Sequence, residues 1–200
     1  MKLEIQVTED TLIPRADTEI LVEEVLSIVK GRKNLLELCT GTGAIGIALA
    51  KYGDFEKVTM TDISKEALQI AKKNIEELLD EGKKQRITLL ESDLFENIED
   101  QYDIIVANPP YIKADEIQNY ELKYEPQLAL DGGEDGLKYY RQIIEKAHSY
   151  LTKEGILVLE IGYDQAEEVK TIIEETRKYK FPRVKKDLSQ NDRVILTQTL

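Results

Sequence analysis

The 200-residue chain is nearly free of cysteine, and this narrows the kinds of site that it can hold. Cys39 is its single cysteine, so an internal disulfide and any zinc or iron–sulfur site built from several cysteines are excluded. Disulfide-poor chains are typical of the reducing cytoplasm. We therefore expect a cytoplasmic protein without a metal site. Cys39 is interpreted as a small buried packing residue, with contact to a ligand of the neighbouring loop as the alternative.

Long apolar runs are also missing. The longest uncharged apolar run is far shorter than the roughly 20 residues that a bilayer-spanning helix needs, and the N-terminal residues Met1–Glu4 hold no apolar signal core. The sequence thus predicts neither a transmembrane helix nor a signal peptide. With 42% hydrophobic and 33% charged residues, the chain has enough apolar material for one folded core.

Basic charge is in deficit. The chain has 27 basic and 39 acidic residues, which gives a net charge of −12. Such a surface repels a phosphate backbone, so we expect no stable nucleic-acid partner, whereas a protein or small-molecule partner stays open. The only basic cluster lies at residues 177–186. We interpret it as a solvated helix end and connection, with a docking patch for an RNA-associated partner as the alternative.

The chain does contain a regular alternation of short β-rich runs and helical segments. One helical segment has apolar positions three and four residues apart, from Ala67 to Leu78, and Ser64 is placed to cap it. This alternation predicts a mostly parallel sheet covered on both faces, with ligands bound beyond the carboxyl ends of its strands. The β-rich runs are Asn34–Cys39, Lys57–Thr61, Arg86–Glu91, Tyr102–Ala107, Ile156–Ile161 and Arg193–Thr197.

A glycine loop follows the first of these runs. Gly41, Gly43 and Gly46 have the G-x-G-x-x-G spacing, in which the first glycine permits a tight turn, the second lets a ligand approach the backbone, and the third allows close helix–strand packing. Asp62 closes the second strand, where its carboxylate can accept both ribose hydroxyls. The loop by itself does not separate a dinucleotide from another adenosine ligand, and a purely structural strand–helix turn is the alternative.

Nearby carboxylates favour S-adenosylmethionine over NAD as the ligand of this loop. Glu37 lies in the first strand, four residues before Gly41, where it can meet a ligand ammonium group or a helix amide. A dinucleotide needs its pyrophosphate at the helix N-terminus, and carboxylates oppose that anion. A zwitterionic sulfonium ligand tolerates them.

The apolar run that ends at Ala107 leads directly into Asn108-Pro109-Pro110-Tyr111. Proline has no N–H, so this turn offers acceptors without competing backbone donors. The Asn108 side-chain oxygen and the Pro109 carbonyl can accept both hydrogens of a planar –NH2 group, and Tyr111 offers a flat face for stacking. Two fixed acceptors would aim the nitrogen lone pair at an electrophilic methyl group. The structural alternative is a rigid turn that ends a strand.

Together these motifs resemble class I S-adenosylmethionine-dependent methyltransferases, and more narrowly the HemK-type protein-(glutamine-N5) methyltransferases that act on peptide-chain release factors. The resemblance covers nearly the whole chain. Asn-Pro-Pro-Tyr alone also occurs in DNA and RNA adenine methyltransferases, and its combination with the other segments makes the resemblance specific. The matching segments are Leu12–Glu19, Leu38–Ile45, Asn108–Ile112, Glu125–Leu130, Gly132–Leu137, Leu159–Gly162 with Gln165, and Asn191–Val194.

The resemblance implies a fold and a set of site residues. The fold is a three-layer α/β sandwich, Rossmann-like, around a seven-stranded, mostly parallel sheet with an antiparallel last strand. Asn108, Pro109, Pro110 and Tyr111 would grip the glutamine amide of the factor's Gly-Gly-Gln loop, with Asn108, Pro109 and Tyr111 as the catalytic residues. The implied cofactor-binding residues are Glu37, Thr40, Gly41, Thr42, Gly43, Asp62, Ile63, Asp93, Leu94 and Asn108.

Family members usually carry a small helical domain before the Ile13-Pro14-Arg15 segment, whereas this chain begins only 12 residues before Ile13. We expect one domain, with a lead-in strand and helix in residues 1–33 and the core in residues 34–200, as either a piece of a longer protein or a short homologue. We also expect a monomer, and in residues 113–137 a long, mobile substrate loop.

The leading hypothesis is methyl transfer from S-adenosylmethionine to the side-chain amide of a protein glutamine, with no metal involved. An adenine-N6 methyltransferase acting on DNA or RNA would use the same turn, although the charge of −12 opposes it. An NAD(P)-dependent oxidoreductase would leave the Asn-Pro-Pro-Tyr turn without a role. A further alternative is an inactive, cofactor-binding partner subunit.

Overall fold

A seven-stranded sheet forms the centre of the protein. The computed structural model describes residues 3–117 and 125–200. The strand order is β3-β2-β1-β4-β5-β7-β6, and only β7 runs antiparallel to its neighbours. The predicted mostly parallel sheet with an antiparallel last strand is thereby confirmed. The strands are β1 (Asn34–Leu38), β2 (Lys57–Asp62), β3 (Ile87–Glu91), β4 (Tyr102–Ala107), β5 (Leu151–Glu160), β6 (Arg183–Lys186) and β7 (Asp192–Gln198).

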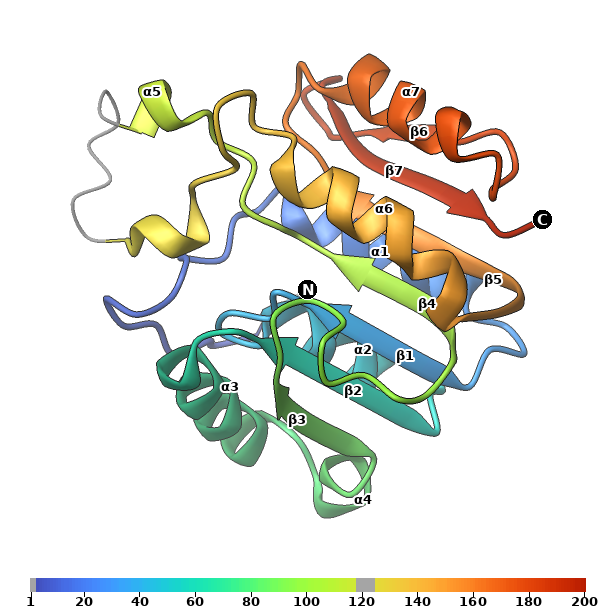
Figure 1. Cartoon of the computed structure of the whole chain (residues 1–200). Coiled ribbons are helices and arrows are strands. Elements are labelled where there is room, and N and C mark those ends of the chain that lie inside the picture. Colours follow the sequence, from blue (N-terminus) through green and yellow to red (C-terminus); the bar gives the residue numbers. More distant parts are fainter. Residues whose placement is uncertain (1–2, 118–124) are drawn as a thin grey trace.

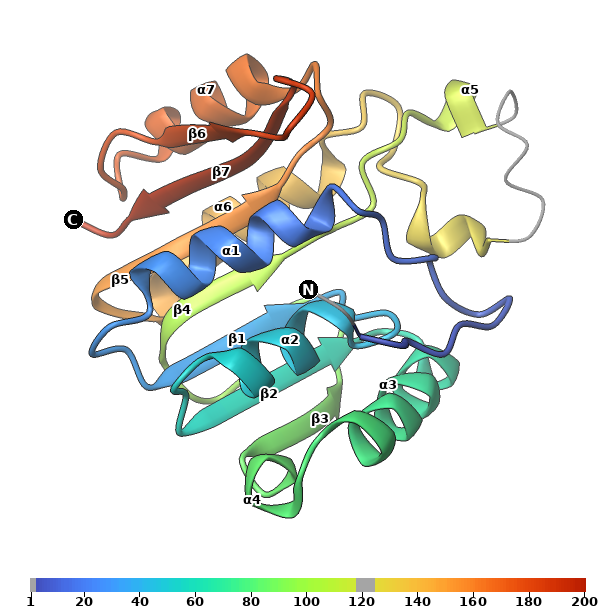
Figure 2. The same ribbon diagram turned by 180° about the vertical axis from the view of Figure 1, so that it is seen from behind.

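Helices cover both faces of this sheet and complete the three layers. Helices α6 and α7 lie in front of it in Figure 1, and the reverse view in Figure 2 shows α1 and α2 on the opposite face. Helix α3 packs beside α2 against β2 and β3. The helices are α1 (Thr18–Ile28), α2 (Ala44–Tyr52), α3 (Lys65–Leu78), α4 (Glu81–Lys84), α5 (Ala114–Ile117), α6 (Lys138–Tyr150) and α7 (Ala166–Thr176), with a 3₁₀ turn η1 (Gln127–Ala129).

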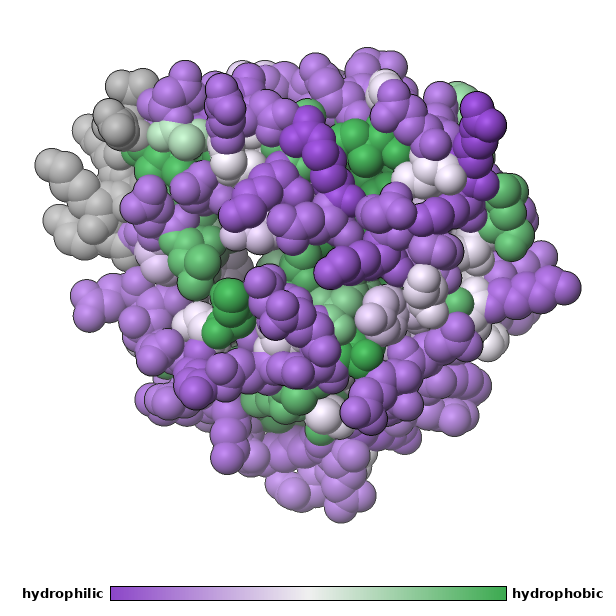
Figure 3. Space-filling model, viewed as in Figure 1, coloured by the Kyte–Doolittle hydropathy of each residue, from purple (hydrophilic) through white to green (hydrophobic). Residues whose placement is uncertain are grey.

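Two hydrophobic clusters lie between the layers, one on each face of the sheet. Both faces contribute because successive side chains of a strand point to opposite faces. In β4, Ile104 and Val106 pack with α1 and α2, whereas Ile105 and Ala107 pack with α6 and α7. The central strands are buried on both faces, which explains why they are continuously apolar in the sequence. Polar residues dominate the surface in Figure 3, and hydrophobic ones emerge in patches near the middle of that face.

One predicted local feature is confirmed, and one predicted strand boundary differs. Ser64 caps α3, since its Oγ accepts a hydrogen bond of 3.1 Å from the Ala67 N–H. Helix α2 begins at Ala44, so Gly46 lies inside its first turn. Strand β5 begins at Leu151 rather than at Ile156. Its first half is polar and pairs irregularly with β4, and the apolar pattern therefore marked only its second half.

The sequence did not predict β6, which lies within the basic cluster of residues 177–186. This strand is at the edge of the sheet, and Arg183, Lys185 and Lys186 are exposed on it. Charged residues on an edge strand prevent pairing with other chains, and they also remove the apolar alternation that reveals a strand. The interpretation of the whole cluster as a helix end and connection is therefore wrong for residues 183–186.

The expected lead-in strand is absent from described residues 3–17, which pair with no strand and contain turns at residues 9–10 and 16–17. A side chain takes the place of a neighbouring strand here. Buried Asn74 of α3 accepts from the Gln6 N–H (2.8 Å) and donates to the Gln6 carbonyl (3.0 Å). The same Asn74 amide donates to the Thr42 carbonyl (2.9 Å), so one residue of α3 fastens both this segment and the glycine loop.

The segment expected to be a long substrate loop is partly structured. Ile112 and Asp131 form an isolated β-bridge, and the Ala114 N–H donates to the Gly133 carbonyl at 3.0 Å. Residues 118–124 lie outside the described part, so the expected mobility of the loop stays a prediction. Within the described ranges, no helix is long and apolar enough to cross a membrane.

Asp103 fastens the amino ends of three strands, at the edge of the sheet opposite the carboxyl ends. Its carboxylate accepts from the Lys33 and Asn34 N–H groups (2.8 and 3.0 Å) and from the Thr152 hydroxyl (2.9 Å). We expect Asp103→Ala to lower the free energy of unfolding by about 1–3 kcal/mol, because partly buried donors lose their acceptor. Chemical denaturation checks this, with exposed Asp54→Ala as the control, and equal losses in both variants would contradict it.

Candidate active site

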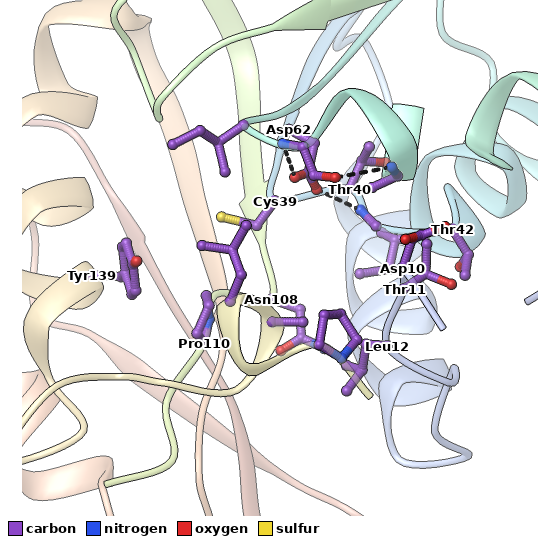
Figure 4. Close-up of a pocket in the computed structure, with 18 of the residues that line it drawn as sticks. Asp10, Thr11, Leu12, Cys39, Thr40, Thr42, Asp62, Asn108, Pro110 and Tyr139 are labelled. Carbon is purple, nitrogen blue, oxygen red and sulfur yellow. Dashed lines mark hydrogen bonds between the residues drawn. The ribbon is translucent and has the colours of Figure 1, made fainter. Parts of the chain in front are cut away.

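A cavity of about 380 Å³ opens at the carboxyl ends of β1, β2, β3 and β4. Its lining comes from the glycine loop, the residues that follow β2, β3 and β4, residues 10–14 of the lead-in segment, residues 126–129, and α6. In Figure 4, Asp62 and Thr40 lie on one side, Asn108 and Pro110 on the other, and Cys39 between them. This is the edge at which the sequence predicts ligand binding.

The glycine loop has the backbone conformations that its residue types suggest. Gly41 has φ 54° and Gly43 has φ 83°, values that most other residues adopt only under strain. A Cβ at Gly46 would overlap Glu37 of β1 and Met60 of β2, so this glycine permits close packing of α2 on the sheet. Among the predicted cofactor residues of the loop, Thr40, Gly41 and Thr42 line the cavity, whereas Gly43 does not.

Asp62 at the end of β2 holds the glycine loop in place. Its Oδ2 accepts from the Gly41 N–H (2.8 Å) and its Oδ1 from the Ser64 N–H (3.0 Å). Burial raises its pKa, and these backbone N–H groups oppose that rise. The carboxylate thus accepts the hydrogen bond of the Gly41 N–H at the tip of the loop, and it also faces the cavity. Ile63, Asp93 and Leu94, the other predicted cofactor residues near it, also line the cavity.

Glu37 does not line the cavity but lies behind the loop. It is fully buried, and its Oε2 accepts from the Thr40 hydroxyl at 2.6 Å. Its Oε1 has no hydrogen-bond partner among the described residues. Burial raises the pKa of Glu37 to about 8, and Asp62 adds to the rise, against the Thr40 hydroxyl and the Gly46 N–H, which lower it. Thr40 therefore stands between this carboxyl and the cavity.

The Asn108-Pro109-Pro110-Tyr111 turn leaves β4 at the floor of the cavity. Asn108 and Pro110 line the cavity, whereas Pro109 and Tyr111 do not. Tyr111 is half-buried against the core on the side of α6, where burial, followed by the Glu160 charge, raises its pKa to about 12. The turn therefore divides its residues between the cavity and the core.

Two features of the site were missed at the sequence level, and a third was weighed only as an alternative. Gln165 fixes the turn, since its Nε2 donates to the carbonyls of Tyr111 (3.0 Å) and Gly136 (3.3 Å). Tyr139 of α6 lines the cavity. Cys39 lines the cavity as well, with φ 57°, which favours the alternative of contact with a ligand over a fully buried packing residue. No spacing in the sequence marks Gln165 or Tyr139, because both reach the site only through tertiary packing.

Glu125, which precedes the lining residues 126–129, joins two segments that are distant in sequence. Its Oε2 accepts from the Ile13 N–H (2.9 Å) and its Oε1 from the Arg15 guanidinium (2.5 Å). The Glu125 side chain is only 4% exposed, whereas the Arg15 side chain is 44% exposed, so the carboxylate is shielded and the guanidinium faces solvent. This pair places residues 10–14 opposite residues 126–129 across the cavity. The sequence quoted both segments, but nothing in their composition indicated that they meet.

Comparison with known proteins agrees with this site. A family model described as Methyltransferase small domain matches residues 15–123. A release factor glutamine methyltransferase from Clostridium acetobutylicum is 41% identical over 204 residues, covering 98% of this chain and 70% of the relative. A second protein of that name, from Lactococcus lactis, is 40% identical over 197 residues, covering 96% and 71%.

The chain belongs to the release factor glutamine methyltransferase family. The resemblance to HemK-type methyltransferases is therefore confirmed. A solved methyltransferase from Pyrococcus furiosus superimposes with a TM-score of 0.71 at 19% identity, over 98% of this chain and 88% of that one. At that identity the likeness concerns the fold alone, and it confirms the predicted Rossmann-like class I methyltransferase architecture.

The charged residues that line the cavity are mainly acidic. Asp10, Asp62 and Asp93 line it, and Lys138 at the start of α6 is the basic residue among the described lining. Within the described ranges, no group of three or more histidine, cysteine, aspartate or glutamate side chains is arranged to hold a metal ion. The cavity therefore suits a ligand that carries positive charge rather than a pyrophosphate.

The buried Glu37 carboxyl makes stability depend on pH. The folded protein keeps Glu37 protonated up to a pKa of about 8, whereas a free glutamate has a pKa of 4.5. Between these values the folded state binds more protons than the unfolded state, so the free energy of unfolding falls as pH rises. We expect Glu37→Gln to remove up to about 1.4 kcal/mol per pH unit of this slope.

Denaturant titrations at pH 5, 6, 7 and 8 measure that slope. Glu168→Gln, an exposed substitution on α7, serves as the matched control and keeps the wild-type slope. If Glu37→Gln and the control show the same pH dependence, Glu37 does not carry a raised pKa.

Proposed function

We propose that this protein transfers a methyl group from S-adenosylmethionine to the side-chain amide nitrogen of a glutamine in a peptide-chain release factor. The observation that carries the proposal is that Asp62 and Asn108, one fixing the glycine loop and the other beginning the proline turn, face the same cavity. A cofactor site and an amide acceptor site thus share one enclosed space. The names of the relatives supply the substrate class.

The glycine-loop side of the cavity fits S-adenosylmethionine better than NAD(P). Asp62 already occupies the Gly41 N–H, which a pyrophosphate would need, and its carboxylate repels that anion. Its free lone pairs suit the ribose hydroxyls, and the acidic lining suits the ammonium and sulfonium charges. In this proposal Asp62, Ile63, Asp93 and Leu94 hold the adenosine part. Glu37 acts through Thr40 on the methionine part.

The proline turn supplies the acceptors for the target amide. In this proposal, the Asn108 Oδ1 accepts one hydrogen of the glutamine –NH2 group in the cavity. The carbonyl of the next residue, Pro109, which lies behind the lining, accepts the other hydrogen when the substrate binds, and Pro110 and Tyr111 keep the turn rigid. S-adenosylmethionine, when bound, supplies an electrophilic methyl group whose carbon–sulfur bond breaks as the nitrogen–carbon bond forms, which leaves S-adenosylhomocysteine and one released proton. The residues of the turn need only orient and polarise the amide, so no strong base is required.

Methylation of adenine in nucleic acid is the less favoured alternative. The net charge of −12 and the acidic cavity lining repel phosphate groups. The basic cluster at residues 177–186 does not offset this repulsion of phosphate, because several of its lysines pair with acidic residues. Lys178 contacts Glu145 (2.6 Å), Lys185 contacts Glu24 (3.7 Å) and Lys186 contacts Asp192 (2.8 Å).

Mass spectrometry of release factor after incubation with the protein and labelled S-adenosylmethionine tests the proposal. We expect one added methyl group on the glutamine of the Gly-Gly-Gln loop. Asn108→Ala should lower the rate by about 100-fold or more, because a positioned acceptor is lost, while cofactor affinity changes little. Exposed Asn191→Ala is the control with wild-type rate. Methylation of mixed nucleic acid in place of release factor would overturn the proposal.

Asp62→Ala tests the cofactor half of the site. Loss of the carboxylate removes hydrogen bonds to charge, so we expect the S-adenosylmethionine dissociation constant to rise by the equivalent of about 1–3 kcal/mol. Isothermal calorimetry measures the constant, with S-adenosylhomocysteine and NADH titrated in parallel. Tighter binding of NADH than of S-adenosylhomocysteine to the wild type would contradict the assignment.

A further inference from the structure

A second buried carboxyl, Glu160, lies at the end of the strand next to the proline turn. Strands β4 and β5 are parallel, and Ala107 pairs with Leu159. The next residue of each strand, Asn108 and Glu160, therefore follows on the same face of the sheet, the one that α1 covers. Glu160 is 1% exposed. The register thus brings a buried carboxyl beside the side chain that opens into the cavity.

Several side chains surround this carboxyl. Thr18, the first residue of α1, and Asn108 lie against it, and each lowers its pKa. Neither contact serves its Oε2, which has no partner among the described residues. The charged and titratable groups that face Glu160 are Asp17 before α1, Arg193 of β7, Tyr111 after β4 and Tyr140 of α6. Arg193 is engaged elsewhere, with Asp187 at 3.2 Å and Asp17 at 3.5 Å.

We propose that Glu160 is a positioning residue that fixes which end of the Asn108 amide faces the cavity. This inference rests on the proposed function and deepens it. An asparagine side chain can present either its oxygen or its –NH2 group, since the two ends have nearly the same shape. A carboxylate only accepts hydrogen bonds, so it selects the –NH2 end of Asn108. The Oδ1 atom then points to the cavity as the acceptor for the substrate amide.

Protonation of Glu160 would remove this selection. A neutral carboxyl carries an O–H donor, which can bind the Asn108 Oδ1 and leave the –NH2 end toward the cavity. Two –NH2 groups would then face each other, and the substrate amide would lose its acceptor. Burial raises the pKa of Glu160 to about 7, whereas the Thr18 hydroxyl, Arg193 and Asn108 lower it. The positioning is therefore present above this pH and lost as pH falls through it.

Kinetics of release factor methylation at saturating S-adenosylmethionine, from pH 5.5 to 9, give the first test. We expect the wild-type kcat to rise with pH through about 7 and then level off. Glu160→Gln should lower the plateau by about 10- to 100-fold, because its own amide does not select one end of Asn108, and the rise near pH 7 should vanish. Glu168→Gln, the exposed control, should keep both. Because S-adenosylmethionine is saturating, an effect of Glu37 on cofactor affinity does not contribute to this rise of kcat with pH.

Nitrogen-15 NMR of side-chain amides gives a second test that does not depend on activity. The Asn108 –NH2 signal is identified by its absence in Asn108→Ala. We expect it to shift with a midpoint near pH 7 in the wild type and in Glu168→Gln, but not in Glu160→Gln. A folded Glu160→Gln protein with the wild-type kcat profile, or an Asn108 signal that does not titrate in the wild type, would overturn the inference. A titrating signal without release factor methylation would instead overturn the proposed function alone.

Discussion

Parallel pairing of β2, β1, β4 and β5 is the constraint from which the site follows. It brings the carboxyl ends of four strands to one edge, so the glycine loop, Asp62 and the proline turn meet there although they are far apart in sequence. The register also decides which side chains share a face. Glu37 in β1 and Glu160 in β5 point to the layer of α1 and α2, directly behind the residues that line the cavity. A shift of one residue would turn both carboxyls toward α6 and α7.

The two buried glutamates share a physical pattern. Each is enclosed, each leaves one oxygen without a partner among the residues that the structure describes, and burial raises the pKa of each, to about 8 for Glu37 and about 7 for Glu160. Burying a carboxyl in this way costs stability, so hydrophobic residues would serve the core better. Each faces polar side chains that line the cavity, Thr40 for Glu37 and both Asn108 and Thr18 for Glu160. The protein thus loses some stability by burying these two carboxyls, and the buried carboxyls in turn orient side chains of the site.

Motifs with a fixed local geometry could be predicted from the sequence, and features created by tertiary packing could not. The positive φ angles of Gly41 and Gly43, the Ser64 cap and the Asp62 strand end follow from residue type and short spacing. The edge strand β6 escaped because its exposed lysines and arginines hide the alternation of a strand. The prediction of a lead-in strand was wrong. Asn74, 68 residues away from Gln6, makes the hydrogen bonds to the Gln6 backbone that a neighbouring strand would otherwise make.

The same distinction explains why the sequence predicted Glu37 as a cofactor-binding residue but indicated no role for Glu160. Glu37 lies four residues before a glycine loop, so its proximity to the site can be read along the chain, although Thr40 stands between it and the cavity. Glu160 meets Asn108 only through the pairing of Ala107 with Leu159, and no property of either segment reveals that register. A motif search finds the residues that touch a ligand. The residues that decide how those side chains are turned lie one strand away, and they become visible only when the sheet is assembled.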